Sequence, residues 1–199
     1  VALGIFVLAD MWPVAARFLS KEDYVAKAPV QASFPKSKAD EMILEDKSPD
    51  YRVLNIMRDV DKDGFTSFWH KSIGGYHGAK LKRYAELIDF HIDKNTAAVV
   101  QGLRTAVNDS SLLAAFEKAQ VLNMLNTKYI IYNNDAPPLL NPLANGNAWF
   151  VKDVQMVKTA DDEILKLGEI NTKEVAIVNE KYPVTKPAFD PEGSITLKS

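Results

Sequence analysis

The spacing of hydrophobic residues changes several times along the chain, and each spacing predicts a type of element. Between residues 79 and 93, apolar side chains recur three and four positions apart, which is typical of a helix with one buried face. That face comprises Leu81, Tyr84, Ala85, Ile88 and Ile92. We expect two further helices, over 95–107 and 109–126. Their caps are expected among side chains that accept hydrogen bonds from a first turn: Asn95 or Thr96, and Asp109 or Ser110.

Runs of β-branched and aromatic residues predict strands at 51–57, 128–133, 148–157 and 174–179. Two short helices are expected at 160–169 and at 38–46, the latter with Met42 and Ile43 facing inward. Strands thus alternate with helices, and the three longer helices fall between the first two strands. This order predicts an α/β or α+β fold, with a mixed β-sheet, flanking helices and a central helical insert.

Proline-rich stretches separate the expected elements. Residues 20–37, interrupted by Pro29 and Pro35, and residues 135–147 are expected to be irregular, because proline interrupts helices and sheet ladders. The tail from Tyr182 either adds an edge strand at "SITLK" or frays. No shift in composition marks a linker, so we expect a single domain over residues 1–199.

The chain opens on an apolar run, "VALGIFVLA", over residues 1–9. It is too short to cross a bilayer alone, since a spanning helix needs about 20 apolar residues. Two interpretations remain from the residues. The run is either a buried strand or the last turns of a transmembrane helix, with Trp12 and Arg17 near the lipid headgroups.

Composition narrows the possible functions. The chain has 199 residues, a net charge of −2 and no cysteine. The weak negative charge gives no overall basic footprint for nucleic acid. The lack of cysteine excludes disulfides, thiolate metal sites and thiol nucleophiles. No nucleotide or cofactor motif is found, so no cofactor is expected.

The segment "SIGGYHGAKLKRY" over 72–84 joins a glycine-rich loop to a basic helix start. Its spacing fits neither a P-loop nor a dinucleotide-binding fingerprint. One interpretation is a turn with solvated basic residues. The other is an anion-binding loop that offers backbone N–H groups and the positive end of a helix dipole. The candidate ligand-binding residues are Gly74, Gly75, Tyr76, His77, Lys80 and Arg83.

A second candidate, "DVDKDG", places Asp59, Asp61 and Asp63 at the first, third and fifth positions of an EF-hand loop. The twelfth position is His70, where a bidentate Glu is required, and a strand rather than a helix precedes the loop. An ordinary Asp/Gly turn is therefore the favoured interpretation, and weak cation binding is the alternative. His91 is expected to be a partly buried residue with its hydrogen bonds satisfied.

Five motifs occur in an order that resembles a known family: "LADMWPV", "YRVLN", "FWHKSIGGYHGAKLKRY", "LNMLNTKYII" and "NPLANGNAWFV". Together they resemble the extracytoplasmic C-terminal part of YfhO-like bacterial membrane proteins, from Leu8 to about Val157. That family is polytopic and is similar to the GT-C class of glycosyltransferases. Such enzymes transfer a sugar from a polyprenyl-phosphate carrier to an acceptor on the outer face of the membrane.

The resemblance implies that this chain is a domain on the extracytoplasmic side of the cell membrane. Its partners would be the transmembrane part of the same polypeptide and a polyprenyl-phosphate sugar or envelope glycan. The resemblance also favours residues 1–9 as the end of a membrane helix. In GT-C enzymes the catalytic carboxylate lies in an early loop of the membrane part, and nothing here matches that loop. No catalytic residue can therefore be carried over from the family, and we expect a lid, acceptor-binding or structural domain that assists substrate or acceptor binding rather than the chemical centre.

Two other functions remain open. One is a non-catalytic envelope scaffold or glycan-binding module, which a groove lined by Trp12, Trp69 or Trp149 would favour, because sugars stack on aromatic rings. The other is a soluble cytoplasmic enzyme, which would require residues 1–9 to be a native N-terminal strand.

Overall fold

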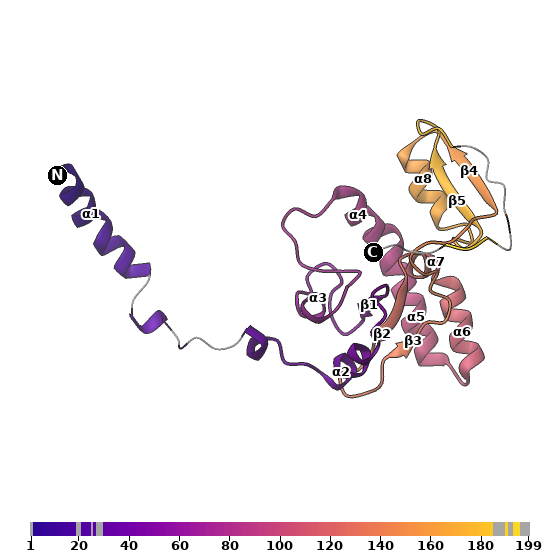
Figure 1. Ribbon diagram of the computed structural model, residues 1–199, viewed down its shortest axis with the longest axis horizontal. Coiled ribbons are helices and arrows are strands. Elements are labelled where there is room, and N and C mark those ends of the chain that lie inside the picture. The colour runs from indigo at the N-terminus through magenta and orange to yellow at the C-terminus, as the bar shows by residue number, and fades with distance from the viewer. Residues whose placement is uncertain are drawn as a thin grey trace. The chain divides into compact units, whose positions relative to one another are not determined.

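The computed structural model describes residues 2–18, 21–24, 26, 30–184, 190 and 193–195. The chain divides into two compact units, Val1–Pro35 and Lys36–Ser199 (Figure 1).

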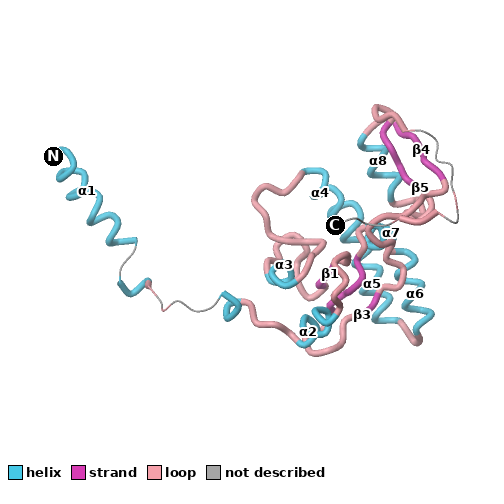
Figure 2. Tube along the Cα trace, viewed as in Figure 1, coloured by secondary structure: helices cyan, strands magenta, loops and turns pink. Residues whose placement is uncertain are grey.

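The first unit contains the helix α1, Ala2–Phe18, and two short 3-10 turns, Lys21–Asp23 and Val30–Ser33 (Figure 2). The strand interpretation of the apolar run is therefore wrong. Good helix formers such as Leu, Ala and Met recur through α1, and no strand among the described residues pairs with it. All its described side chains are exposed. No helix in the described part of the chain combines the length and apolar character needed to cross a bilayer.

The second unit begins with α2, Lys38–Glu45, which Ser37 and Asp40 cap reciprocally. Ile43 is fully buried as expected, whereas the expectation for Met42 is wrong, because its side chain is 45% exposed. Adjacent helical residues point about 100° apart, so one narrow buried face holds only one of the two.

A three-stranded mixed sheet follows, in the order β1-β2-β3 (Figure 1). β1, Arg52–Asn55, pairs in parallel with β2, Thr127–Ile131, and β2 pairs antiparallel with β3, Leu139–Leu140. Side chains alternate between the two faces of the sheet. Val53 and Ile131 contact α2, while Leu54 and Ile130 join the larger helical core. The predicted mixed sheet with flanking helices is thus confirmed.

The predicted helical insert lies between β1 and β2, but its helices are divided differently. The elements are α3, Phe65–Trp69; α4, Lys82–Leu87; a π-helical segment, Ile88–Ile92; α5, Asp93–Thr105; α6, Asp109–Lys118; and α7, Gln120–Met124. From α4 to α5 the helix is continuous, so the expected break near residue 94 is wrong. Leu81 precedes the helix and is 76% exposed, so its expected burial is also wrong.

The helix caps differ from the expected ones. Asn108 caps α6 in a reciprocal pair with Ser111, so neither Asp109 nor Ser110 is the cap. Asn95 caps a different helix, because its Oδ1 accepts hydrogen bonds from the backbone N–H groups of Val121 and Leu122 at 2.9 and 3.4 Å. Asn95, which lies in α5, therefore holds the first turn of α7 against α5.

The last part of the chain forms a separate two-stranded parallel sheet. β4, Asp153–Val157, and β5, Val175–Asn179, are joined through α8, Ala160–Leu167, which Thr159 caps together with Asp162. Of the tail expected as an edge strand, Ser194 and Ile195 lie outside any strand and the rest lies outside the described residues.

Candidate functional site

The glycine pair packs tightly against the aspartate-rich turn. A Cβ on Gly74 would lie 2.0 Å from the carbonyl oxygen of Val60, and Gly75 has a φ of +140°. The Gly75 N–H donates to the same Val60 oxygen at 2.8 Å, and the Gly74 N–H donates to Oγ of Ser72 at 3.0 Å. Only glycine fits this approach without strain. Two N–H groups of the predicted anion loop are thus already bound within the protein.

The other four candidate residues of this segment do not converge on one place. Tyr76 is 76% exposed, and Nδ1 of His77 accepts a hydrogen bond from the N–H of Ala79. Lys80 Nζ donates to the carbonyl of Asp61 at 3.2 Å, whereas Arg83 binds Glu163 on α8. The six candidates are therefore spread over a turn, a loop and a helix rather than gathered around one anion.

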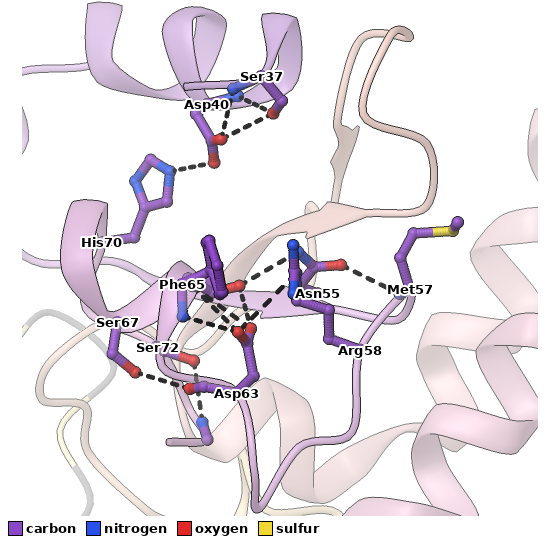
Figure 3. Close-up of polar contacts among 12 residues, drawn as sticks. Ser37, Asp40, Asn55, Met57, Arg58, Asp63, Phe65, Ser67, His70 and Ser72 are labelled. Atoms are coloured by element: carbon purple, nitrogen blue, oxygen red, sulfur yellow. Dashed lines mark hydrogen bonds and ion pairs between the residues drawn. The ribbon is translucent and has the colours of Figure 1, made fainter. Parts of the chain in front are cut away.

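The three aspartates of the EF-hand-like motif also have separate roles. Asp63 is buried and accepts hydrogen bonds from Phe65 and Thr66, so its carboxylate initiates α3 (Figure 3). Asp59 is exposed and pairs with Lys62 at 3.0 Å. Asp61 contributes its carbonyl to Lys80. Within the described ranges, no three acidic or histidine side chains are grouped to hold a metal ion.

His70, at the twelfth position of that motif, faces α2 instead (Figure 3). Its Nε2 lies 2.9 Å from Oδ1 of Asp40, and its side chain is 1% exposed. Burial alone raises the pKa of Asp40, but the hydrogen bonds from His70 and Ser37 outweigh this and lower the pKa below its ordinary value. Asp40 therefore stays ionised and Nε2 of His70 is the donor.

The residue that anchors the basic segment is Tyr84, whose hydroxyl donates to the Ile73 carbonyl. Burial raises the pKa of Tyr84, so the hydroxyl keeps its proton at neutral pH. This bond holds the first turn of α4 beside the glycine loop.

Arg83 projects into a cleft of about 720 Å³ between α4 and the β4–α8–β5 layer. One wall comes from α4 and the opposite wall from α8 and β5. Its apolar lining consists of Leu87, Met124, Trp149, Val151, Ala160, Ile164, Leu167, Ile170, Val175, Ala176 and Ile177. The charged lining consists of Lys82, Arg83, Glu86, Asp161, Glu163 and Lys181. The cleft thus combines apolar walls with a rim of balanced charge.

Trp149 is the aromatic side chain of the cleft, and its orientation is fixed. Its indole N–H donates to the carbonyl of Thr172 at 2.9 Å. Thr172 is buried and is held in turn by Gln120. Lys173 lies 5.9 Å from the ring and lines a smaller hollow that Trp149 also borders. Trp149 therefore lines both hollows, with its indole N–H bound to the Thr172 backbone.

Two ion pairs lie on the rim of the cleft. Arg83 and Glu163, 80 positions apart in the sequence, meet at 2.8 Å and join opposite walls. Lys82 and Glu86 meet at 3.5 Å within one helix. The carbonyl of Ile164, on the second wall, accepts a hydrogen bond from Nε2 of the buried His91 in the π-helical segment, so His91 has a partner, as expected.

Sequence reasoning found Arg83 and named Trp149 as a possible groove residue, but it did not bring the two together. It missed Glu163, Ile164 and Thr172, because these come from segments that no local spacing connects to α4. Of the other tryptophans, Trp12 lies exposed on α1 and Trp69 lies under Lys36, at 4.4 Å from its ammonium group.

No family model, curated protein or solved structure matches this chain.

Proposed function

We propose that the chain is an extracytoplasmic accessory domain of a YfhO-like membrane protein, and that its cleft binds a saccharide during glycosyl transfer. The observation that carries this proposal is Trp149, which is rigidly held in the wall of a cleft that Arg83 and Glu163 border.

The size and lining of the cleft support a small ligand. Its volume of about 720 Å³ is within the range of ligand pockets, about 300–1,000 Å³. An aromatic ring offers a flat apolar face to the C–H groups of a sugar ring. The Thr172 bond holds the indole of Trp149 in one orientation before binding, which lowers the entropic cost of stacking.

The charges at the rim support recognition of hydroxyl groups. A carboxylate accepts hydrogen bonds from hydroxyls, and a guanidinium donates several in one plane. Glu163 and Arg83 supply both functions at one point. Because the rim carries three cationic and three anionic side chains, it favours a neutral saccharide over a polyanion.

The proposal assigns binding rather than catalysis to the cleft. Glu86 and Glu163 are each held in an ion pair, with Lys82 and Arg83. The proposed position at the membrane is supported by α1, whose apolar side chains are exposed, including Phe6 and Trp12 at 74% each. Attachment to a transmembrane part would bury such side chains.

The test is calorimetric titration of the full chain with a panel of neutral and acidic oligosaccharides. We expect a neutral oligosaccharide to bind and Trp149→Ala to weaken its affinity at least tenfold. Trp69→Ala is the matched control, because that ring does not line the cleft, and its affinity should be unchanged. No binding across the panel, or equal affinity in Trp149→Ala and the parent chain, would refute the proposal.

A further inference from the structure

The two walls of the cleft are connected in two ways that differ in strength. The first connection is buried. His91 donates to the Ile164 carbonyl, and a Cβ on Gly168 would lie only 2.9 Å from Cε1 of the same ring. The close approach of Gly168 lets α8 lie directly against the imidazole. The backbone of α8 is therefore fixed relative to the π-helical segment.

The second connection is the Arg83–Glu163 ion pair, which faces solvent. The Arg83 side chain is 69% exposed and the Glu163 side chain 28%. Ion pairs this exposed are weak and are screened by salt. The pair therefore opens far more easily than the His91 contact, although Glu163 and Ile164 are neighbours in the sequence.

We propose that the Arg83 side chain is a strap across the mouth of the cleft, closed on Glu163 and opened by salt or by ligand. Because His91 fixes the backbone of α8, opening moves the arginine side chain into solvent while the walls keep their separation. Opening also frees the Glu163 carboxylate to accept hydrogen bonds. The identity of the ligand rests on the proposed function, whereas the strap itself does not.

The chain supplies a matched control for this strap. Glu86 and Glu163 both line the cleft and both pair with a basic residue of α4. The Lys82–Glu86 pair lies along one helix, and only the Arg83–Glu163 pair joins the two walls. Glu86→Gln and Glu163→Gln therefore remove the same charge from the same rim, and only the second opens the strap.

The experiment measures how easily acrylamide quenches Trp149 fluorescence, in a Trp12→Phe, Trp69→Phe background and without ligand. We expect the quenching constant to rise about twofold between low and high salt. Glu163→Gln should show the raised value already at low salt and lose the salt dependence, and Arg83→Met should do the same. Circular dichroism checks the fold of each variant, and Arg83→Met replaces Glu163→Gln if the latter unfolds.

Two results would overturn the strap. One is a quenching constant in Arg83→Met that equals that of the parent at every salt concentration. The other is an equal rise in Glu86→Gln, which would show a general charge effect. Because no saccharide is present, these results are independent of oligosaccharide binding, so the strap and the proposed function can fail separately.

Discussion

Nε2 of His70 lies 2.9 Å from Oδ1 of Asp40 and thereby joins the end of α3 to the first turn of α2. The other ring nitrogen of His70, Nδ1, is buried without a hydrogen-bond partner among the described residues. The imidazole thus depends on one carboxylate, which itself caps α2 through Ser37.

Replacing that carboxylate should destabilise the second unit. We expect Asp40→Asn to lower the free energy of unfolding by about 1–3 kcal/mol, the usual cost of weakening a buried charged hydrogen bond. Asp162→Asn is the control, because Asp162 caps α8 with Thr159 in the same reciprocal arrangement and contacts no histidine. It should cost about 0.5 kcal/mol, since the Asn side-chain oxygen can still accept the hydrogen bonds from Thr159 and only a negative charge near the helix N-terminus is lost. Urea unfolding at neutral pH measures both, and equal losses would contradict a special role for His70.

Alanine should destabilise the protein at Gly74, the first glycine of the loop, but not at Gly78, the last one. Gly74→Ala should lower the free energy of unfolding by about 2–4 kcal/mol, because its Cβ would clash with the Val60 carbonyl. Gly78→Ala should leave stability unchanged or raise it by about 0.5 kcal/mol, because nothing lies within 4 Å of its Cβ and alanine restricts the unfolded chain. Thermal unfolding of both variants checks this. Similar melting temperatures would show that the loop tolerates a shift of its backbone.

Asp46 should make the domain sensitive to acid. Hydrogen bonds from Lys128, Ser48 and Tyr129 lower the pKa of Asp46 from 3.8 to about 2. A carboxyl with a lowered pKa in the folded state stabilises the protein above its ordinary pKa. This stabilisation is therefore complete above pH 3.8 and is lost as the pH falls toward about 2.

The measurement is the free energy of unfolding of the parent chain and of Asp46→Asn between pH 2 and 7. The difference between them should be constant above about pH 4 and shrink below it. Asp135→Asn serves as the control, because its ion pair with Lys38 is long, at 4.0 Å, and highly exposed on both sides. A difference that does not change with pH would show that the charge of Asp46 does not contribute to the free energy of unfolding.

Asn95 should matter for a helix to which it does not belong. Asn95→Ala should lower the free energy of unfolding by about 1–2 kcal/mol, since two N–H groups of α7 would lose their acceptor. Lys94→Ala, at the exposed neighbouring position, should have little effect. Hydrogen exchange can localise the change: the amides of Val121 and Leu122 should exchange faster in Asn95→Ala. Unaltered exchange there would contradict the capping role.

The positions of most elements were predictable because they depend on local periodicity. The helix that contains α4 follows from apolar residues three and four positions apart, and the strands follow from runs of β-branched and aromatic residues. Two of the errors, the cap of α6 and the burial of Met42, occurred where two neighbouring residues competed for one role. Asn108 and Asp109 are both capping types, and only the reciprocal partner Ser111 identifies Asn108 as the cap.

The cleft could not be predicted in the same way. Arg83 and Glu163 are brought together because α8 packs on His91. This close packing is possible because Gly168 has no side chain. The spacing of residues along one segment carries no information about such a contact. The basic segment was correctly noticed as unusual, but Gly74 and Gly75 pack against Val60, and of the basic residues in the segment Lys82 and Arg83 line the cleft.

The π-helical segment Ile88–Ile92 determines which side chains of the following helix, α5, face the core, because it sets their rotation about the helix axis. Deleting one residue there would restore a regular turn and rotate α5 by about 100°. Val99 would then leave the core, and Gly102 would no longer face Ala115 of α6. Relatives of this chain should therefore vary in length at their loops and keep the number of residues between Tyr84 and Val99 constant.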